Sequence, residues 1–427
     1  MKTFPVYVGR CAGYDSEKIA AVIRNGMKAI GFSRPISGKI VVKPNLVMAH
    51  PKVATECYTR PEVVEAVVQV LRERGRDIRK IDIVEKSGLG VTTASMFRWA
   101  GYRGLRKRCG ARLVAMEEGR HSTVVLRNGR IHHHITVARE MAERDFLVFI
   151  PKLKTNVLSH AYSGALKLNI GTVDSAERLF HHNRDLPLKI ADLLEAANPD
   201  LIVTDGIRMA FGGNQMTQGG TDIGIIVVSA NAVAHDMACA RMLNLDPMRI
   251  GHIREAAERG YGPSSFNQVR IIGDFPVKSV QALTRKLDFG FYPVEKFKSP
   301  FRIVSGSPYC TGGCHGIFLD WLHMVRDRKP GLIKRFPALT VLIGRVGGDI
   351  RAGRILLIGN CAKASPGIRG KKAVRITGCP PTHKRIVLAM MLRYGLLAPL
   401  VRPSLIIDGF VLYPLKKLKG WLVNLAH

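Results

Sequence analysis

The first 275 residues alternate between strand-like and helix-like segments, and this alternation constrains the fold more than any other feature. Apolar runs at 39–47 and 79–88 end in turn residues, and between them residues 60–75 carry apolar side chains at helical spacing before a glycine. A strand-like run at 221–231 is likewise followed by a helix-like segment at 232–245. Strands separated by helices predict an α/β fold with a largely parallel, twisted sheet and helices on both faces.

Polar side chains follow several of the predicted strands, at the edge where ligands bind in open α/β sheets. Lysines at these ends would form a cationic pocket for a carboxylate or a phosphate. Solvent-exposed lysines with no ligand are the simpler alternative. The predicted substrate-binding residues are Lys43, Asn45, Lys152, Lys154, Lys167 and Asn169. Two carboxylates at strand ends, Glu85 and Asp205, are predicted to move protons.

Four of the eight cysteines lie in the last third of the chain, each within two residues of a glycine. Cys310 and Cys314 form CTGGC, Cys361 follows a Gly-Asn pair, and Cys379 lies between a glycine and two prolines in TGCPP. Glycines let the backbone approach a bulky inorganic core and leave N–H groups free for its sulfides. We predict that these four thiols are the ligands of a 4Fe-4S cluster.

Zinc and unligated thiols are the alternatives for this cysteine set. Structural zinc sites usually contain Cys-x2-Cys pairs, and the sequence has none. Disulfides are not expected, because the N-terminus shows no secretory signal. The other four cysteines are scattered in ordinary contexts and are predicted to be small core residues: Cys11, Cys57, Cys109 and Cys239.

Seven motifs, in their order along the chain, resemble the domain-of-unknown-function 362 family: KPNLV, RPEVVEAVV, IVEKSG, FIPKLKTN, SGALKLNIGTV, NPDLIVTDGI and SANAVAHDMACARML. The resemblance covers about residues 5–275, and the three cysteine segments are similar to the tail of one branch of that family. It implies an iron–sulfur protein of redox character with no agreed reaction. We therefore divide the chain into an α/β domain at 1–285, a smaller cluster-binding region at 286–385 and a basic amphipathic tail at 386–427.

The formal charge of +32 is concentrated towards the C-terminus. From Arg285 onward there are 25 Lys and Arg against 6 Asp and Glu, a net charge of +19. Such a surface attracts anionic partners, and we expect an acidic ferredoxin-like or flavodoxin-like protein. Nucleic acid is not expected, because no recognised nucleic-acid-binding motif is visible and aromatic residues make up only 7%. The tail can lie on an anionic membrane surface, pack on the protein or contact a second copy in a homodimer.

Two classes of function follow. The first is an iron–sulfur redox protein, either an oxidoreductase or an electron-transfer component, that acts on an anionic small molecule. The alternative is a non-enzymatic binding or scaffold protein with a structural cluster or zinc, docked on a membrane surface or nucleic acid. No apolar run is long enough to span a bilayer, so we expect a cytoplasmic protein that can contact the inner face of the membrane.

Overall fold

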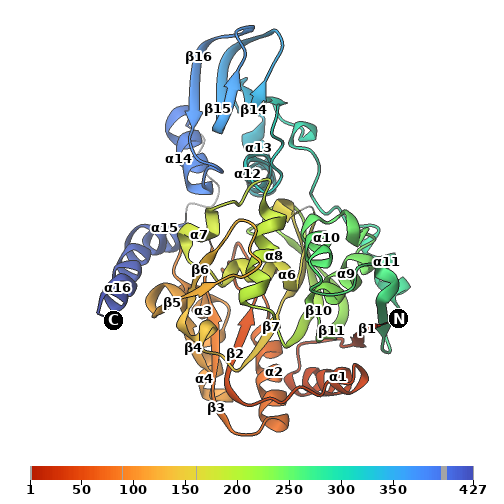
Figure 1. Cartoon of the computed structure of the whole chain (residues 1–427). Coiled ribbons are helices and arrows are strands. Elements are labelled where there is room, and N and C mark those ends of the chain that lie inside the picture. Colours follow the sequence, from red (N-terminus) through yellow and green to blue (C-terminus); the bar gives the residue numbers. More distant parts are fainter. Residues whose placement is uncertain (1, 89, 160, 396–401, 427) are drawn as a thin grey trace.

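The computed structural model describes residues 2–88, 90–159, 161–395 and 402–426. A broad α/β body carries a narrower C-terminal extension, and the last helix lies along the side of the body (Figure 1). Eight strands of the main ten-stranded sheet form one path, in the order β12 (Val269–Ile272), β1 (Phe4–Arg10), β11 (Gly219–Ser229), β10 (Leu201–Phe211), β7 (Phe146–Ile150), β2 (Gly38–Pro44), β3 (Ile78–Glu85) and β4 (Arg112–Ala115). The other two, β8 (Lys152–Asn156) and β9 (Ala161–Ser163), continue from β10.

Most neighbouring strands of this sheet are parallel, which confirms the predicted fold class. β2 is parallel to β3 and β7, β3 to β4, and β10 to β7 and β8. The exceptions include β11, which is antiparallel to both β10 and β1. A short connection without a helix joins β10 and β11, and such a connection is typical of an antiparallel pair.

Helices cover both faces of the sheet, and alternate strand residues pack against them. Val41 and Leu147 face one core, while their neighbours Ile40, Val42 and Val148 face the other. The second core contains α1 (Ser16–Ala29), α2 (Pro61–Arg74), α3 (Thr93–Trp99) and α4 (Leu105–Cys109). The first contains α6 (Ala165–Leu168), α8 (Leu186–Ala196), α9 (Ala232–Met242) and α10 (Gly251–Glu258).

The extension is a second, smaller α/β unit with a core of its own. Its sheet has four parallel strands in the order β13 (Arg302–Ser305), β14 (Thr340–Val346), β15 (Ile350–Ala364) and β16 (Ile368–Ile376). Its helices are α12 (Cys314–Arg328), α13 (Pro330–Ile333) and α14 (His383–Tyr394). The predicted cysteine-bearing region is therefore built around a regular sheet.

The remaining elements are shorter or lie at the edges of these two units. The strands are β5 (His121–Val125) and β6 (His134–Ala138). The helices are α5 (Arg139–Ala142), α7 (Ser175–Leu179), α11 (Val277–Thr284), α15 (Pro403–Ile407), the π-helix η8 (Asp408–Leu412) and α16 (Tyr413–Leu425). The 3-10 turns are η1 (Tyr102–Gly104), η2 (Met116–Glu118), η3 (Val157–Ser159), η4 (Asn169–Gly171), η5 (Pro247–Arg249), η6 (Phe266–Gln268) and η7 (Val294–Lys296). Within the described ranges, no helix combines the length and the apolar character needed to cross a bilayer.

Candidate functional site

The register of the small sheet brings Cys361 and Cys379 to equivalent positions. β15 and β16 pair with an offset of 18 residues, so that Ile358 lies opposite Ile376, and the two cysteines are separated by the same offset. Just before them, the Asn360 amide donates to the carbonyl of Gly378 at 2.9 Å, and the Gly378 amide donates to Asn360 Oδ1 at 2.7 Å. Neighbouring strands lie about 4.8 Å apart, so both thiols belong to the same edge of this sheet.

Cys310 and Cys314 reach the same place from the turn that begins α12. The turn is closed by the Gly313 amide, which donates to the carbonyl of Cys310 at 3.0 Å. Gly359 of β15, at φ +96°, lies so close that a Cβ there would be 2.6 Å from Cys314 Sγ. Only glycine fits this contact, because the backbone is in the left-handed region and the thiol fills the space of a side chain.

The four thiols lie within electrostatic reach of one another. Burial raises the pKa of Cys314 to about 12, and the negative charges that Cys361, Cys310 and Cys379 would carry raise it as well. Burial also raises the pKa of Cys310, with contributions from Cys361 and Cys379. Within the described part of the chain, no three His, Cys, Asp or Glu side chains are grouped so as to hold a metal ion. The structure thus gathers the predicted cysteines, while their role as ligands stays a prediction.

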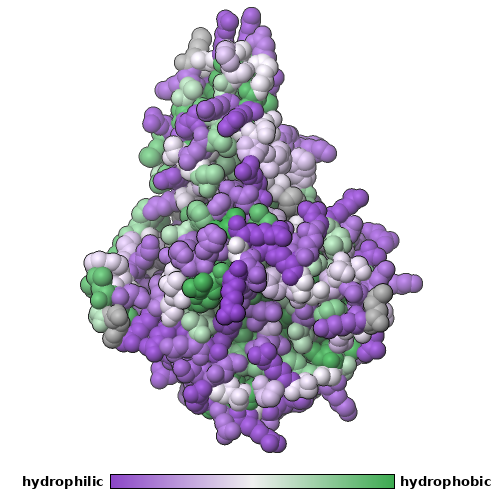
Figure 2. Space-filling model, in the orientation of Figure 1, coloured by the Kyte–Doolittle hydropathy of each residue, from purple (hydrophilic) through white to green (hydrophobic). Residues whose placement is uncertain are grey.

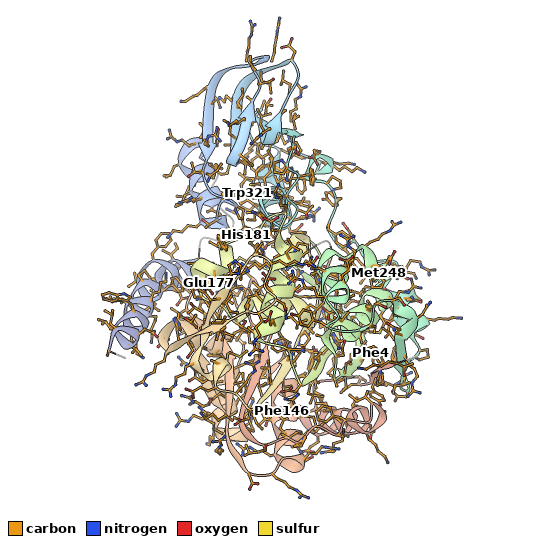
Figure 3. The ribbon with its side chains drawn as sticks, viewed as in Figure 1. Phe4, Phe146, Glu177, His181, Met248 and Trp321 are labelled. Atoms are coloured by element: carbon orange, nitrogen blue, oxygen red, sulfur yellow. The ribbon has the colours of Figure 1, made fainter. Side chains whose placement is uncertain are left out.

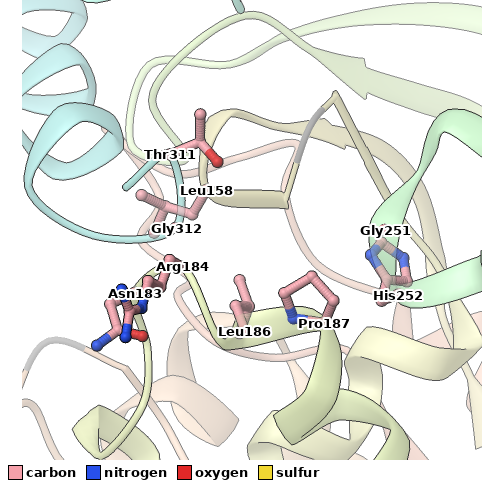
Figure 4. A pocket seen from close by; sticks show the side chains of 9 residues that line it. All are labelled: Leu158, Asn183, Arg184, Leu186, Pro187, Gly251, His252, Thr311 and Gly312. Carbon is pink, nitrogen blue, oxygen red and sulfur yellow. The ribbon is translucent and has the colours of Figure 1, made fainter. Parts of the chain in front are cut away.

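The loop between α7 and α8 lies against this cysteine centre. Asn183 Nδ2 is 3.8 Å from Cys379 Sγ, and a Cβ on Gly312 would be 2.7 Å from the Asn183 carbonyl oxygen. Figure 3 shows His181 of the same loop where the extension meets the body, below Trp321 of α12. A small cavity of about 30 Å³ lies beside it between Asn183, Pro187 and Gly312 (Figure 4), with room for about one water molecule.

Two of the predicted substrate-binding lysines are paired with the two predicted catalytic carboxylates. Lys43 Nζ lies 2.6 Å from Glu85 Oε1, and Lys152 Nζ lies 2.9 Å from Asp205 Oδ2. Glu85 also accepts from the Leu46 amide at 2.9 Å, and all four side chains are buried. A proton-transfer role for Glu85 and Asp205 stays a prediction, and their observed contacts hold the strand ends together.

Asn45 belongs to the loop after β2, where its own contacts hold it. Its side-chain amide donates to the carbonyl of Cys57 at 2.7 Å, and its backbone amide donates to the Thr59 hydroxyl at 3.1 Å. These contacts fix the loop and leave the Asn45 amide engaged. Its predicted part in substrate binding is not tested by this geometry.

Lys154 and Lys167 form a different kind of site, because neither is in an ion pair with a described carboxylate. Only 2% of Lys154 is exposed, and burial lowers its pKa. Burial, followed by the charges of Lys154 and Arg178, lowers the pKa of Lys167 to about 7. Asn169 follows Lys167 by one short turn, is fully buried, and has no described partner for its amide oxygen or nitrogen. The buried Lys154, the partly buried Lys167 and the unpartnered amide of Asn169 offer donors for an anion.

Several residues of this cationic site were not predicted from the sequence. Arg178, at the end of α7, lowers the pKa of Lys43 as well as that of Lys167 and donates to the carbonyl of Ser87 at 2.7 Å. His182 is buried, and burial, followed by the charge of Lys167, holds its pKa well below the usual value. The order of residues along the chain gave no signal for this convergence.

The extension contributes to the cationic site through α12. The charge of Asp320 on this helix partly offsets the lowering of the pKa values of Lys154 and Lys167, and Asp320 accepts from His383 Nε2 at 2.7 Å. Cys314 begins the same helix. The cysteine centre and the cationic site therefore share α12 and the α7–α8 loop, which makes them neighbours in one region of the molecule.

Residues 40–241 match the family described as "Domain of unknown function (DUF362)". A thylakoid-associated protein from Synechocystis sp. is 25% identical over 268 residues, which cover 60% of this chain and 79% of that protein. The lactate racemase apoprotein from Thermoanaerobacterium thermosaccharolyticum superimposes with a TM-score of 0.37 and 11% identity over 56% of this chain and 57% of that chain.

Proposed function

This chain belongs, through residues 40–241, to the domain-of-unknown-function 362 family, and we propose that it is a 4Fe-4S redox protein that acts on an anionic small molecule. The observation that carries the proposal is the gathering of four thiols from three separate segments of the extension. α12 and the α7–α8 loop connect these thiols to two unpaired lysines of the body. A redox group and an anion site placed next to each other suit an oxidoreductase better than a purely structural protein.

The donor set fits a cluster. Cys310, Cys314, Cys361 and Cys379 supply four sulfur ligands, the number that such clusters take. Burial raises the pKa values of Cys310 and Cys314 in the absence of a cation, and a bound metal core would favour their thiolate forms. A bound cluster would supply one-electron transfer.

The residues of the body would hold the substrate beside this centre. Lys154 and Lys167 would bind a carboxylate or phosphate group, and Asn169 would donate a further hydrogen bond. Binding of an anion would favour protonation of Lys167, whose pKa of about 7 allows it to gain or lose a proton near neutral pH. The electrons would come singly from an acidic ferredoxin-like or flavodoxin-like protein and reduce the bound substrate, or pass in the reverse direction.

The test is the iron and sulfide content of protein purified without oxygen. We expect about four iron and four sulfide per chain, lost in Cys361→Ser and in Cys379→Ser but retained in Cys239→Ser and Cys109→Ser, whose thiols lie in the body. Equal iron content in all four variants, or stoichiometric zinc in place of iron, would contradict the cluster.

A second pair of variants separates an enzyme from a scaffold. Lys154→Met and Lys167→Met should retain the iron but lose reductant-dependent turnover, or anion binding measured by calorimetry with phosphate and small carboxylates. If both variants bind these anions as the wild type does, the cationic site is not the substrate site.

A further inference from the structure

The C-terminal helical segment from Ile407 to Leu425 exposes its apolar side chains and directs polar ones inward. Large hydrophobic residues recur three or four positions apart along its outer face, with exposed fractions of 51% to 62%: Ile407, Val411, Leu415, Leu418, Leu422 and Leu425. Phe410 and Trp421 lie beside them and are 55% and 58% exposed. We call this set the apolar stripe. An exposed contiguous stripe of this kind marks an interaction site.

The opposite face of the segment is fixed to the body by polar contacts. Asp408, only 1% exposed, accepts from the amide and hydroxyl of Thr92 at 2.8 and 2.7 Å and from the Ser95 hydroxyl at 2.8 Å. Further along, a Cβ on Gly420 would lie 2.1 Å from the Glu117 carbonyl oxygen. Because the helix packs closely through this face, the apolar stripe cannot turn inward without breaking these contacts.

Further ties at the end of α16 keep the segment in this orientation. Lys416 Nζ lies 2.9 Å from Glu118 Oε2, and Asn424 Oδ1 accepts from the His121 amide at 2.7 Å. In Figure 1 the segment runs along the outer side of the body, and Figure 2 shows hydrophobic residues at that same edge. The stripe therefore belongs to a helix that is well attached, and it faces outward.

We propose that the apolar stripe docks this protein on a membrane surface that contains anionic lipids. Cations accompany the stripe, including the exposed Lys417 and Lys419, while Asp408, the single carboxylate of residues 402–426, is buried. Lys384 Nζ adds to them, 4.0 Å from the centre of the Phe410 ring. Apolar side chains with a Trp and a rim of lysines fit the boundary between acyl chains and headgroups.

A second copy of this chain fits the stripe less well than a lipid surface. Each copy carries a formal charge of +32, so pairing through a face rimmed with lysines brings like charges together. Because Asp408, Gly420 and Asn424 hold the segment against the body along its length, it would lie in the plane of the membrane rather than cross it. Docking would need neither the cysteine centre nor the cationic site, so the docking proposal can fail without affecting the proposed redox function.

Flotation of the full-length protein with lipid vesicles tests this proposal. We expect the wild type to bind vesicles of phosphatidylcholine with about 30% phosphatidylglycerol at least tenfold more tightly than pure phosphatidylcholine vesicles. Leu418→Asp should weaken binding about tenfold, and Leu418→Asp with Leu422→Asp should abolish it. Leu283→Asp, on the exposed side of α11 and away from α16, is the matched control and should bind as the wild type does.

The stability and the fluorescence of the variants decide how the flotation result is interpreted. Equal Tm values for the variants and the wild type would show that loss of flotation comes from the surface and not from unfolding. Binding should shift Trp421 fluorescence to the blue, and Trp421→Phe should remove that shift. No vesicle binding, binding unchanged by the double substitution, or a wild-type dimer that the double substitution turns into a monomer would each overturn the proposal.

Discussion

Lys167→Met should stabilise the protein in a pH-dependent way, because Lys167 is held among cations without an ion-paired carboxylate. Its pKa falls from 10.5 to about 7 on folding. Below pH 7 the lysine is charged in both the folded and the unfolded chain, and the folded state bears the full cost of burying that charge. Above pH 10.5 it is neutral in both states and the cost vanishes. Stability due to this group therefore rises as the pH increases from 7 to 10.5.

The size of the effect follows from the shift. A difference of 3.5 pKa units corresponds to about 5 kcal/mol at about 1.36 kcal/mol per unit. Lys167 is only partly buried, and relaxation and water lower such a cost, so we expect the substitution to gain about 2 kcal/mol at pH 6. Methionine keeps the length and apolar stem of lysine, so that packing changes little.

Urea unfolding at pH 6 and at pH 10 measures this difference. The variant should be more stable than the wild type at pH 6, and the gain should nearly disappear at pH 10. Lys417→Met, on the exposed tail, is the control and should show no such pH dependence. If Lys167→Met destabilises the protein equally at both values of pH, the lysine is not held in a cationic site and our account of that site is wrong.

Three further predictions follow from single contacts. Gly359→Ala should lower the free energy of unfolding by about 1–3 kcal/mol and reduce the iron content, because Gly359 has a φ of +96° and contacts Cys314 Sγ. Gly353, which has open space around it, is the control, and Gly353→Ala should change neither value. Urea unfolding and iron analysis measure the two effects. Asp408→Ala should raise amide hydrogen exchange of residues 403–425 about 100-fold, since the buried contacts to Thr92 and Ser95 are lost; unchanged exchange would show that the segment is held by other contacts. Phosphate should raise the Tm of the wild type more at pH 6 than at pH 9, because Lys167 must be protonated to bind an anion, and it should have little effect on Lys154→Met.

Much of the fold could be predicted from the sequence, because local patterns of apolar residues determine it. The alternation of apolar runs and helical spacing predicted the main sheet, and alternate residues such as Ile40 and Val41 do face opposite cores. The antiparallel β10–β11 pair was not foreseen, because two consecutive strands read alike whether they return parallel or antiparallel. The polarity of the tail was visible, but a helical pattern alone cannot say which face packs against the body.

The candidate site was foreseen only in part, because it depends on long-range contacts. The lysines at strand ends were identified from their position after buried runs. Which of these lysines would pair with Glu85 or Asp205 depended on the register of strands that are distant in the sequence. Arg178 and Asp320 join Lys167 from another loop and from the extension, and no local pattern links them. The glycines near the cysteines were the one local signal for the thiol cluster. The 18-residue offset between β15 and β16, which brings Cys361 and Cys379 to equivalent positions, could not be read from that signal.

The most direct measurement of the central proposal is electron paramagnetic resonance of the full chain, purified without oxygen and frozen after reduction with dithionite. We expect visible absorbance before reduction and a rhombic signal afterwards that integrates to about one spin per chain and is absent from Cys379→Ser. A protein with no iron absorbance and no signal on reduction, although all four cysteines are intact, would contradict the account.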